Sequence, residues 1–185
     1  MHSIIRATVK DYSLLARIGE KTFLESHGHS APLADIENYV QEKYNDEACL
    51  LELENPKNIY HFIYHEGQAA GFSKIIPDEP HPQIDNPRLT KLERIYILRK
   101  YYHLKLGWSL LHHNIEISKA FAQQGMWLYV WKENERAIRF YSNNGFRISG
   151  SHDFKISETH SNPNHIMFLD YAVPAIPSRG SVLPE

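Results

Sequence analysis

The stretch LYVWKENERAIRFYSNNGF, residues 128–146, joins an apolar strand pattern to a helical pattern of barely three turns. The strand letters end at a polar turn, the helix begins near Asn134, and an Asn-Gly-Phe sequence ends it. Helical spacing places Ala137, Phe140 and Tyr141 on the inner face of this helix. Either ordinary packing or a ligand lying beneath the helix explains such a face on so short a helix.

The chain on both sides of this stretch alternates between strand and helix patterns. Apolar residues at every second position predict strands, and apolar residues three and four positions apart predict helices. The predicted elements, in order, are a strand at 3–9, a helix after Asp11, a helix after Pro32, a short helix at 46–56, a hairpin at 59–76, a strand at 90–98, a helix at 106–125, a strand at 126–132, a helix at 134–144 and strands at 146–156 and 165–173. We expect one domain over residues 1–173 and a loose, Pro/Gly/Ser-rich tail over residues 174–185.

This order predicts an α/β protein with a mixed, mostly antiparallel sheet of about seven strands and flanking helices. The strand at 90–98, the helix at 106–125 and the strand at 126–132 form a β-α-β unit, whose two strands run parallel. The hairpins make the rest of the sheet antiparallel. Ligands favour the carboxyl ends of parallel strands, where helix N-termini present free N–H groups. We therefore expect a binding site at that end of the parallel pair.

The composition of the 185 residues is that of an ordinary globular protein. Hydrophobic residues make up 42% and charged residues 23% of the chain, and no apolar run approaches the ~20 residues of a membrane span. The formal net charge of -2 and the lack of a dense Lys/Arg stripe argue against nucleic-acid binding. No signal-peptide pattern is visible, and the single cysteine, Cys49, excludes an internal disulfide. We expect a cytoplasmic protein without membrane attachment.

The histidines and serines do not form a recognisable metal or hydrolase motif. His112 and His113 are neighbours on a predicted helix, so their side chains diverge, and no Cys/His ligand spacing occurs. A Ser-His-Asp hydrolase would need a G-x-S-x-G turn, which the chain lacks. We therefore predict no metal ion and no serine-hydrolase chemistry.

The turn between the strand at 90–98 and the helix at 106–125 reads YYHLKLGW, residues 101–108. A phosphate-binding turn needs backbone N–H groups that converge ahead of a helix N-terminus, with small residues that allow close approach. Gly107 and basic neighbours such as Lys105 meet these needs in part. A single glycine before a helix is also common for packing reasons, and these residues alone leave both interpretations open.

Two segments resemble the signature regions of the Gcn5-related N-acetyltransferase (GNAT) superfamily. They are ERIYILRKYYHLKLGWSLL, residues 93–111, and NERAIRFYSNNGF, residues 134–146. The family's first region ends in an (Arg/Gln)-x-x-Gly-x-(Gly/Ala) turn that wraps the pyrophosphate of acetyl-coenzyme A. Here Tyr102 and Lys105 replace the first two defined residues of that turn, and Gly107 keeps the last. The second region matches N-x-x-A-x-x-(F/L)-Y-x-x-x-G-F at every defined position.

The resemblance implies an acetyltransferase-type fold, acetyl-coenzyme A as co-substrate, and a central parallel strand pair that splays to admit the pantetheine arm. The segments KTFLESHG, SGSHDF and HIMF also resemble bacterial polyamine acetyltransferases of the PaiA type. The cofactor-binding residues implied by the resemblance come from the strand, the turn and the short helix. They are Ile95, Tyr96, Ile97, Tyr102, His103, Leu104, Lys105, Leu106, Gly107, Trp108, Asn134, Ala137 and Phe140.

Acetyl transfer to an amine needs a base for the ammonium proton and an acid for the departing thiolate, because alkylamines have a pKa of ~10. The resemblance makes Tyr141 the general acid and Glu93 the general base. On a regular strand, Glu93 lies on the same face as Ile95 and Ile97. Each role has an alternative: a packed tyrosine with a hydrogen-bonded hydroxyl, and a glutamate in a salt bridge with a neighbouring residue.

The acceptor amine is expected to meet side chains from the first two helices, with Glu25 and Tyr39 as predicted substrate-binding residues. Glu20 and three acids of the proline-rich loop before residue 90 either extend an acidic channel or form plain solvated surface. The favoured function is an acetyl-coenzyme A-dependent N-acetyltransferase of a small polyamine-like amine. The alternatives are a protein N-terminal or lysine acetyltransferase, and a regulatory module that binds acetyl-coenzyme A without turnover, which Tyr102 and Lys105 motivate. A homodimer is left open.

Overall fold

Seven strands form one mixed sheet in the computed structural model, which describes residues 1–173. The strands are β1 (His2–Arg6), β2 (Ile59–His65), β3 (Gln68–Ile76), β4 (Leu89–Ile97), β5 (Gly125–Trp131), β6 (Arg147–Lys155) and β7 (Ser161–Asp170). Their order across the sheet is β1-β2-β3-β4-β5-β7-β6. All neighbours are antiparallel except β4 and β5, which run parallel. The predicted mixed, mostly antiparallel sheet is confirmed.

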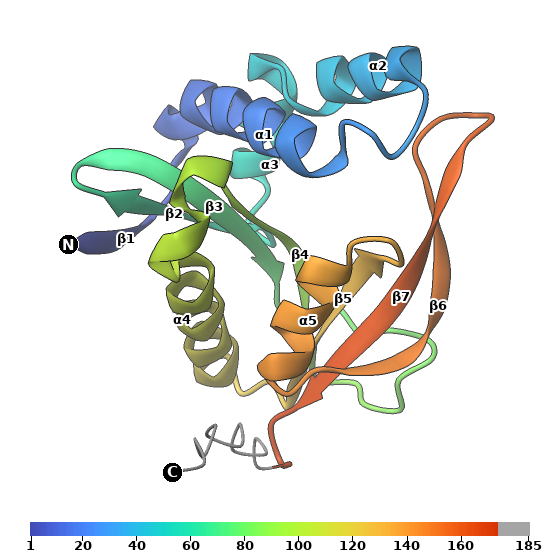
Figure 1. Cartoon of the computed structure of the whole chain (residues 1–185). Helices are drawn as coiled ribbons and strands as arrows, with labels where there is room; N and C mark the ends of the chain where they lie inside the picture. Colours follow the sequence, from blue (N-terminus) through green and yellow to red (C-terminus); the bar gives the residue numbers. More distant parts are fainter. Residues whose placement is uncertain (174–185) are drawn as a thin grey trace, which may run out of the picture.

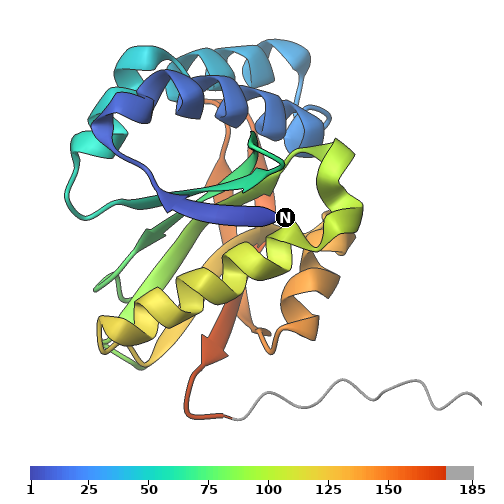
Figure 2. The same ribbon diagram turned by 90° about the vertical axis from the view of Figure 1, so that its left-hand side faces the viewer.

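Helices cover both faces of this sheet (Figures 1 and 2). The layer on one face contains α1 (Tyr12–His27), α2 (Leu33–Lys43) and α3 (Asp46–Glu54). The opposite face carries α4 (Leu106–Ala120) and α5 (Glu135–Asn143). Two 3-10 turns, η1 (Val9–Asp11) and η2 (Arg99–Leu104), precede α1 and α4.

Each helix layer buries its own apolar cluster against the sheet. Leu15 and Phe23 of α1 join a cluster that contains Phe72 of β3. On the other face, Leu111 of α4 shares a cluster with Tyr141 of α5. Burying such a side chain stabilises the fold by ~1.5–3 kcal/mol. Packing of this kind, more than intrinsic propensity, therefore holds α5, which has only 9 residues.

The predicted order of elements is confirmed, and the differences lie at the ends of elements. Helix α4 ends at Ala120, before the predicted end at Gly125, because Ala122 adopts a left-handed φ of 55° that a continuing helix excludes. Residues 99–104 form η2, a 3-10 turn that the sequence patterns did not predict. Strand β7 begins at Ser161, ahead of the predicted start, because pairing with β6 extends it.

The parallel strands β4 and β5 separate along their length. Their ladder pairs residues 89–91 with residues 125–127, and the described residues contain no further pairing between the two strands. Beyond Lys91, β4 keeps its antiparallel partner β3, and β5 keeps β7. The backbone groups of β4 that face β5 beyond Lys91 are therefore outside any strand ladder. The expected splay of the central pair is confirmed.

A β-bulge interrupts β4 at Glu93. Lys74 of β3 pairs with Arg94, and the next residue of β3 pairs with Leu92, so Glu93 has no partner across the ladder. The bulge changes the alternation of side chains along β4. Leu92 and Ile95, three residues apart, both pack in the cluster beneath α4.

Two expectations from the sequence remain predictions. The predicted loose tail, residues 174–185, lies outside the described residues, and the domain boundary at residue 173 stays a prediction. None of the helices within residues 1–173 is both long enough and apolar enough to span a membrane. The cytoplasmic location also stays a prediction.

Candidate active site

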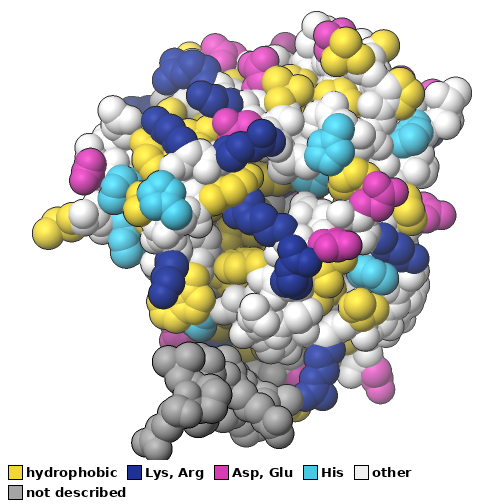
Figure 3. All heavy atoms as spheres, in the orientation of Figure 1, with side chains coloured by type: hydrophobic (Ala, Val, Ile, Leu, Met, Phe, Trp, Pro, Cys, Tyr) yellow, Lys and Arg dark blue, Asp and Glu magenta, His cyan; other side chains and the backbone are white. Residues whose placement is uncertain are grey.

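A cavity of about 1380 Å³ opens where β4 and β5 separate. Strand β4 lines it from Lys91 to Ile97, and its walls come from η2, α4 and α5 and from α1, α2 and the β6–β7 hairpin. On the face drawn in Figure 3, Lys and Arg side chains gather around a hollow. A typical small-molecule site has a volume of ~300–1,000 Å³, so this cavity has room for two substrates.

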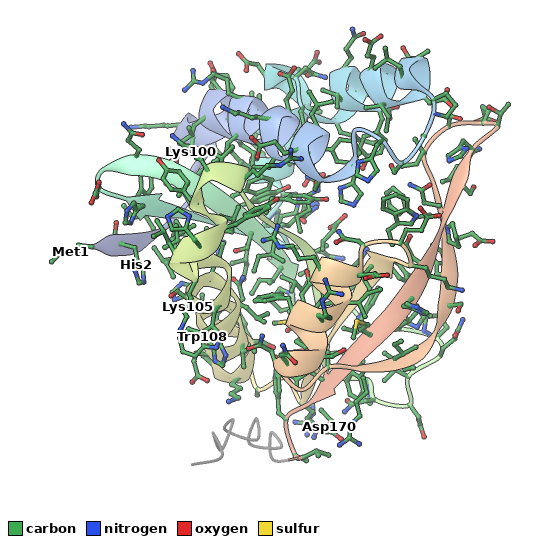
Figure 4. The ribbon with its side chains drawn as sticks, viewed as in Figure 1. Met1, His2, Lys100, Lys105, Trp108 and Asp170 are labelled. Carbon is green, nitrogen blue, oxygen red and sulfur yellow. The ribbon has the colours of Figure 1, made fainter. Side chains whose placement is uncertain are left out.

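The turn that precedes α4 has an unusual backbone conformation. Lys105 adopts φ 55° and ψ 18°, in the left-handed region. Glycine adopts this conformation freely, whereas other residues pay about 1–2 kcal/mol. Position 105 is where the GNAT turn motif has its first glycine, so Lys105 adopts a glycine-like backbone conformation at a position where the motif has glycine. Figure 4 shows Lys105 and Trp108 at the start of α4.

Gly107 lies on the cavity wall in the first turn of α4. A Cβ atom at this position would lie 3.7 Å from Ile97 and 3.8 Å from Phe140, which are ordinary contact distances. The packing of the protein therefore does not require glycine here. The open space beside Gly107 belongs to the cavity, which favours close approach of a ligand over a packing role.

Most of the predicted cofactor-binding residues line this cavity. They are Ile95, Tyr96, Ile97, Tyr102, Lys105, Gly107, Trp108, Asn134, Ala137 and Phe140. Three others do not: His103 is exposed, whereas Leu104 and Leu106 pack with Leu110 beneath the turn. The coil of η2 and α4 turns these three side chains away from the cavity, and their implied cofactor-binding role through backbone N–H groups stays a prediction. Only their backbone groups remain for the predicted role.

Asn134 is the N-cap of α5. Its Oδ1 accepts a hydrogen bond of 3.1 Å from the backbone N–H of Ala137, which satisfies one of the free donors of the first turn. The spacing of three residues between Asn134 and Ala137 is thus a capping geometry. If Asn134 binds coenzyme A, as the resemblance implies, its side-chain NH₂ group, which this cap leaves free, is the available donor.

Tyr141 of α5 is 8% exposed and lies on the cavity wall. Its ring contacts those of Phe140 and Phe146, with centroids 5.2 and 5.5 Å away. Burial raises the pKa of the phenol well above its ordinary value, so the hydroxyl keeps its proton throughout the neutral range. The hydroxyl of Tyr141 forms no hydrogen bond with another group of residues 1–173. Its proton is therefore available to a group in the cavity.

The carboxylate of Glu93 also lines the cavity, and Lys74 holds it. The Nζ of Lys74 lies 2.8 Å from Oε2 of Glu93 and 2.6 Å from Oε2 of Glu52 in α3. Burial raises the pKa of Glu93, but the charge and hydrogen bond of Lys74, with smaller effects of Lys91 and Arg94, outweigh burial and lower this pKa below its usual range. Glu93 is therefore ionised at neutral pH.

The surroundings of Glu93 differ from the prediction in two respects. Its carboxylate lies with Glu52 on the side of α1–α3, and not with Ile95 and Ile97 on the side of α4, because the bulge breaks the alternation of β4. Its salt bridge is formed with Lys74 of the adjacent strand instead of a neighbour in sequence. Glu93 still lines the cavity, and its general-base role stays a prediction.

Aromatic side chains line the cavity where α1, α2, β5 and the β6–β7 hairpin meet. Phe23 stacks on Tyr39 with centroids 4.7 Å apart, and Tyr39 lies 6.3 Å from Phe154. His27 lies 6.3 Å from Trp131. Burial lowers the pKa of His27 to about 4, so its ring is neutral at pH 7. We call these five residues the aromatic wall.

The acidic channel considered for the acceptor is not assembled. Glu25 and Tyr39 line the cavity, as predicted, but Glu25 is already engaged. Its Oε2 accepts a hydrogen bond of 2.7 Å from the backbone N–H of Arg99, whose guanidinium donates to the carbonyl of Glu25. The other acids lie outside the cavity lining, in agreement with the surface interpretation: Glu20, Asp78, Glu79 and Asp85.

The cavity residues that sequence reasoning missed include Phe23, His27, Arg136 and Phe154. Each lies in a segment that resembles the family, yet at a position where the signature motifs define no residue. Phe154 reaches the cavity because the β6–β7 hairpin curls toward the α1–α2 connection (Figure 1), where His160 hydrogen-bonds the carbonyl of Ser30 at 3.1 Å. The resemblance of these segments to the family was the one feature of the sequence that indicated these cavity residues.

These parts fit the successive portions of coenzyme A. The separated strands leave backbone groups for an extended arm, and the turn before α4 offers helix N–H groups to phosphates. The model of the Acetyltransferase (GNAT) family matches residues 21–146. The chain belongs to this family. It is an acetyl-coenzyme A-dependent N-acetyltransferase of the GNAT fold.

The following relatives have low sequence identity to this chain. An uncharacterized N-acetyltransferase of Lactobacillus delbrueckii is 25% identical over 84% of this chain and 90% of its own length. Spermidine N(1)-acetyltransferase of Thermoplasma acidophilum is 24% identical over 78% of this chain and 88% of its own. The crystal structure of PaiA N-acetyltransferase from T. acidophilum with coenzyme A superposes with a TM-score of 0.73 at 22% identity, over 92% of this chain and 99% of that chain. Together they support the GNAT fold along most of this chain.

Proposed function

We propose that this GNAT N-acetyltransferase acetylates a small primary amine of the polyamine kind. The observation that carries the proposal is the aromatic wall, which bounds the same cavity as Tyr141 and Glu93. The name of the spermidine N(1)-acetyltransferase among the relatives supports the same class of acceptor.

The protonation states of the two proposed catalytic residues suit this reaction. Acetyl-coenzyme A, when bound, supplies the activated acetyl thioester. Glu93 is ionised and takes the ammonium proton, directly or through water, and its lowered pKa makes it a transient carrier that passes the proton to solvent. Tyr141 is protonated and donates to the departing thiolate. Each residue thus starts in the state that its role requires.

A polyamine carries a second ammonium group besides the one that is acetylated. Faces of aromatic rings attract such a cation at up to ~6 Å, with ~0.5–2 kcal/mol of stabilisation. The carboxylate of Glu93 is paired with Lys74, whereas within the described residues that of Glu25 accepts only the backbone N–H of Arg99 and keeps its negative charge. Phe23 is stacked on both His27 and Tyr39, so the ring faces of Tyr39, Trp131 and Phe154, beside a neutral His27, are the proposed site for the second charge.

An assay of coenzyme A release over a panel of amines tests the acceptor class. The panel contains spermidine, putrescine, butylamine, phenethylamine, and peptides with a free N-terminus or a lysine. We expect kcat/KM for the polyamines to exceed that for butylamine by about tenfold, because only the polyamines place a cation against the rings. A preference for phenethylamine or for a peptide would overturn the polyamine assignment. Absence of coenzyme A release with every amine of the panel would also overturn it.

A variant of the aromatic wall tests its part in recognition. Phe154 is half-buried on the β6–β7 hairpin, so Phe154→Leu is expected to fold. It should lower kcat/KM several-fold for spermidine and leave that for butylamine nearly unchanged. The matched control is Phe121→Leu, because Phe121 is 52% exposed and outside the cavity lining. An equal loss of kcat/KM for both amines would mean that Phe154 shapes the cavity but does not bind the second ammonium group.

A further inference from the structure

Arg136 and Tyr102 form a contact between two walls of the cavity. The guanidinium carbon of Arg136 lies 3.2 Å from the centroid of the Tyr102 ring. Arg136 is the second residue of α5, and Tyr102 belongs to η2. Both side chains line the cavity, so the pair joins the short helix to the turn that leads into α4.

Position 102 is where the GNAT turn motif has Arg or Gln. A tyrosine brings neither a positive charge nor a forked donor to the pyrophosphate. The guanidinium of Arg136, against the Tyr102 ring, brings a positive charge and a forked donor to the same part of the cavity wall, although it comes from a segment 34 positions later in the chain. Arg136 is therefore placed to take over the role of the Arg or Gln that Tyr102 replaces.

The charge of Arg136 is not used within the described residues. Of the other two arginines on the cavity wall, Arg94 lies 4.0 Å from the carboxylate of Glu52, and the guanidinium of Arg99 donates to the backbone carbonyl of Glu25. No salt bridge within residues 1–173 involves Arg136. A cation in the first turn of a helix also faces the positive end of the helix dipole, which is unfavourable. An anion bound beside Arg136 would remove that penalty.

We propose that Arg136, held by the Tyr102 ring, binds the phosphate groups of acetyl-coenzyme A. A guanidinium stacked on a ring keeps its N–H donors in its own plane, where they point past the ring edge. That planar fork matches two oxygens of a phosphate. Tyr102 restricts the long side chain in advance, so less conformational freedom is lost on binding.

Calorimetry with coenzyme A and with pantetheine, which lacks phosphates, tests this assignment without the acetyl-transfer reaction. Arg136→Gln is expected to weaken coenzyme A binding about tenfold at low ionic strength and to leave pantetheine binding unchanged. The matched control is Arg139→Gln on the same helix, because Arg139 pairs with Glu135 at 3.0 Å and lies outside the cavity lining. The control should change coenzyme A affinity by less than about twofold.

A second pair of variants separates the effect of the Tyr102 ring from that of the Arg136 charge. Tyr102→Leu keeps the guanidinium but removes its support, so a smaller loss of coenzyme A affinity is expected than for Arg136→Gln. Tyr102→Arg combined with Arg136→Gln returns a guanidinium to the motif position and should recover most of the lost affinity. Urea unfolding of each variant verifies that the fold is retained.

Two outcomes would overturn the proposal. Equal losses for Arg136→Gln and Arg139→Gln would show that only the net charge of α5 matters. A parallel loss of pantetheine binding in Arg136→Gln would show that Arg136 supports the position of α5 and does not contact phosphate.

Discussion

The ammonium of Lys74 lies 2.8 Å from the carboxylate of Glu93, and the side chain of Lys74 is 4% exposed. The same ammonium lies 2.6 Å from Glu52 of α3. One buried lysine thus ties the proposed general base to a helix on the opposite side of the sheet from α5. Removing one partner of a buried ion pair leaves charge uncompensated, so substitution of either carboxylate is expected to affect stability. Only Glu93 lines the cavity, however.

Glu93→Gln should lower kcat by ~10²-fold, because the amide cannot accept the ammonium proton. Lys74 keeps the pKa of Glu93 below its usual range. An acidic limb of the pH–rate profile above pH 5 therefore belongs to another group, and it should be the same in Glu93→Gln as in the unmodified protein. Steady-state kinetics at saturating amine, from pH 5 to 9, measures both quantities.

Glu52→Gln is the control, because it weakens the same ion-pair network without reaching the cavity. We expect a loss of stability like that of Glu93→Gln, but nearly normal kcat. If the two variants lose activity equally, Glu93 acts only through the Lys74 network and the salt-bridge interpretation is correct.

Tyr141→Phe should separate binding from chemistry. The ring still fills its place between Phe140 and Phe146, whereas the proton for the departing thiolate is lost. We expect kcat to fall by ~10²-fold with unchanged coenzyme A affinity in calorimetry. Stability in urea should change by less than ~0.5 kcal/mol, because the burial of the hydroxyl involves no protein hydrogen bond within residues 1–173. A steady kcat, with chemistry shown to limit the rate, would make Tyr141 a packing residue.

Gly107→Ala should change stability and binding in opposite directions. The new methyl group meets Ile97 and Phe140 at ordinary distances, and alanine in a helix is favoured over glycine by ~0.5–1 kcal/mol. The same methyl group enters the cavity and should weaken coenzyme A binding. Urea unfolding and calorimetry on one preparation test the two effects. Unchanged affinity would remove Gly107 from the cofactor site.

Lys105→Gly should stabilise the protein by about 0.5–1 kcal/mol, because it removes a steric penalty of ~1–2 kcal/mol, whereas the greater conformational freedom of unfolded glycine costs ~0.5–1 kcal/mol. Lys105→Ala removes the same ammonium but keeps the penalty. Equal weakening of coenzyme A binding in both variants would assign the effect to the charge. A loss in stability for Lys105→Gly would mean that the lysine side chain contributes more than the strained backbone costs.

Acid should destabilise the protein through two histidines. Burial lowers the pKa of His27 and of His61 to about 4, whereas the unfolded chain binds these protons near the ordinary value of 6.5. The stability they contribute is therefore complete above pH 6.5 and is lost as pH falls toward 4, by about 1.4 kcal/mol per pH unit and histidine. Urea unfolding at pH 4.5, 5.5 and 6.5 should show a shallower slope in His27→Gln and His61→Gln, and the shallowest in the double variant. An unchanged slope would show that both histidines bind protons equally in the folded and unfolded protein, so that burial does not lower their pKa.

Local patterns in the sequence determined the order of elements and the cofactor side of the site. The spacing of Asn134, Ala137 and Tyr141 follows from a helix cap and from helical periodicity, which act over a few residues. The β-α-β pattern made the central pair parallel through the direction of its crossover. These rules act between residues that are close in sequence, so they can be applied without knowing which distant segments pack together.

Only the tertiary structure decided the environment of Glu93, the aromatic wall and the partner of Tyr102. A period of two assumes an uninterrupted ladder, and the bulge at Glu93 arises from the register between β3 and β4, which the letters of β4 do not contain. Lys74 and Arg136 meet Glu93 and Tyr102 because separate segments pack against one another. Contacts of this kind depend on the summed packing of the whole chain, and no local pattern specifies them.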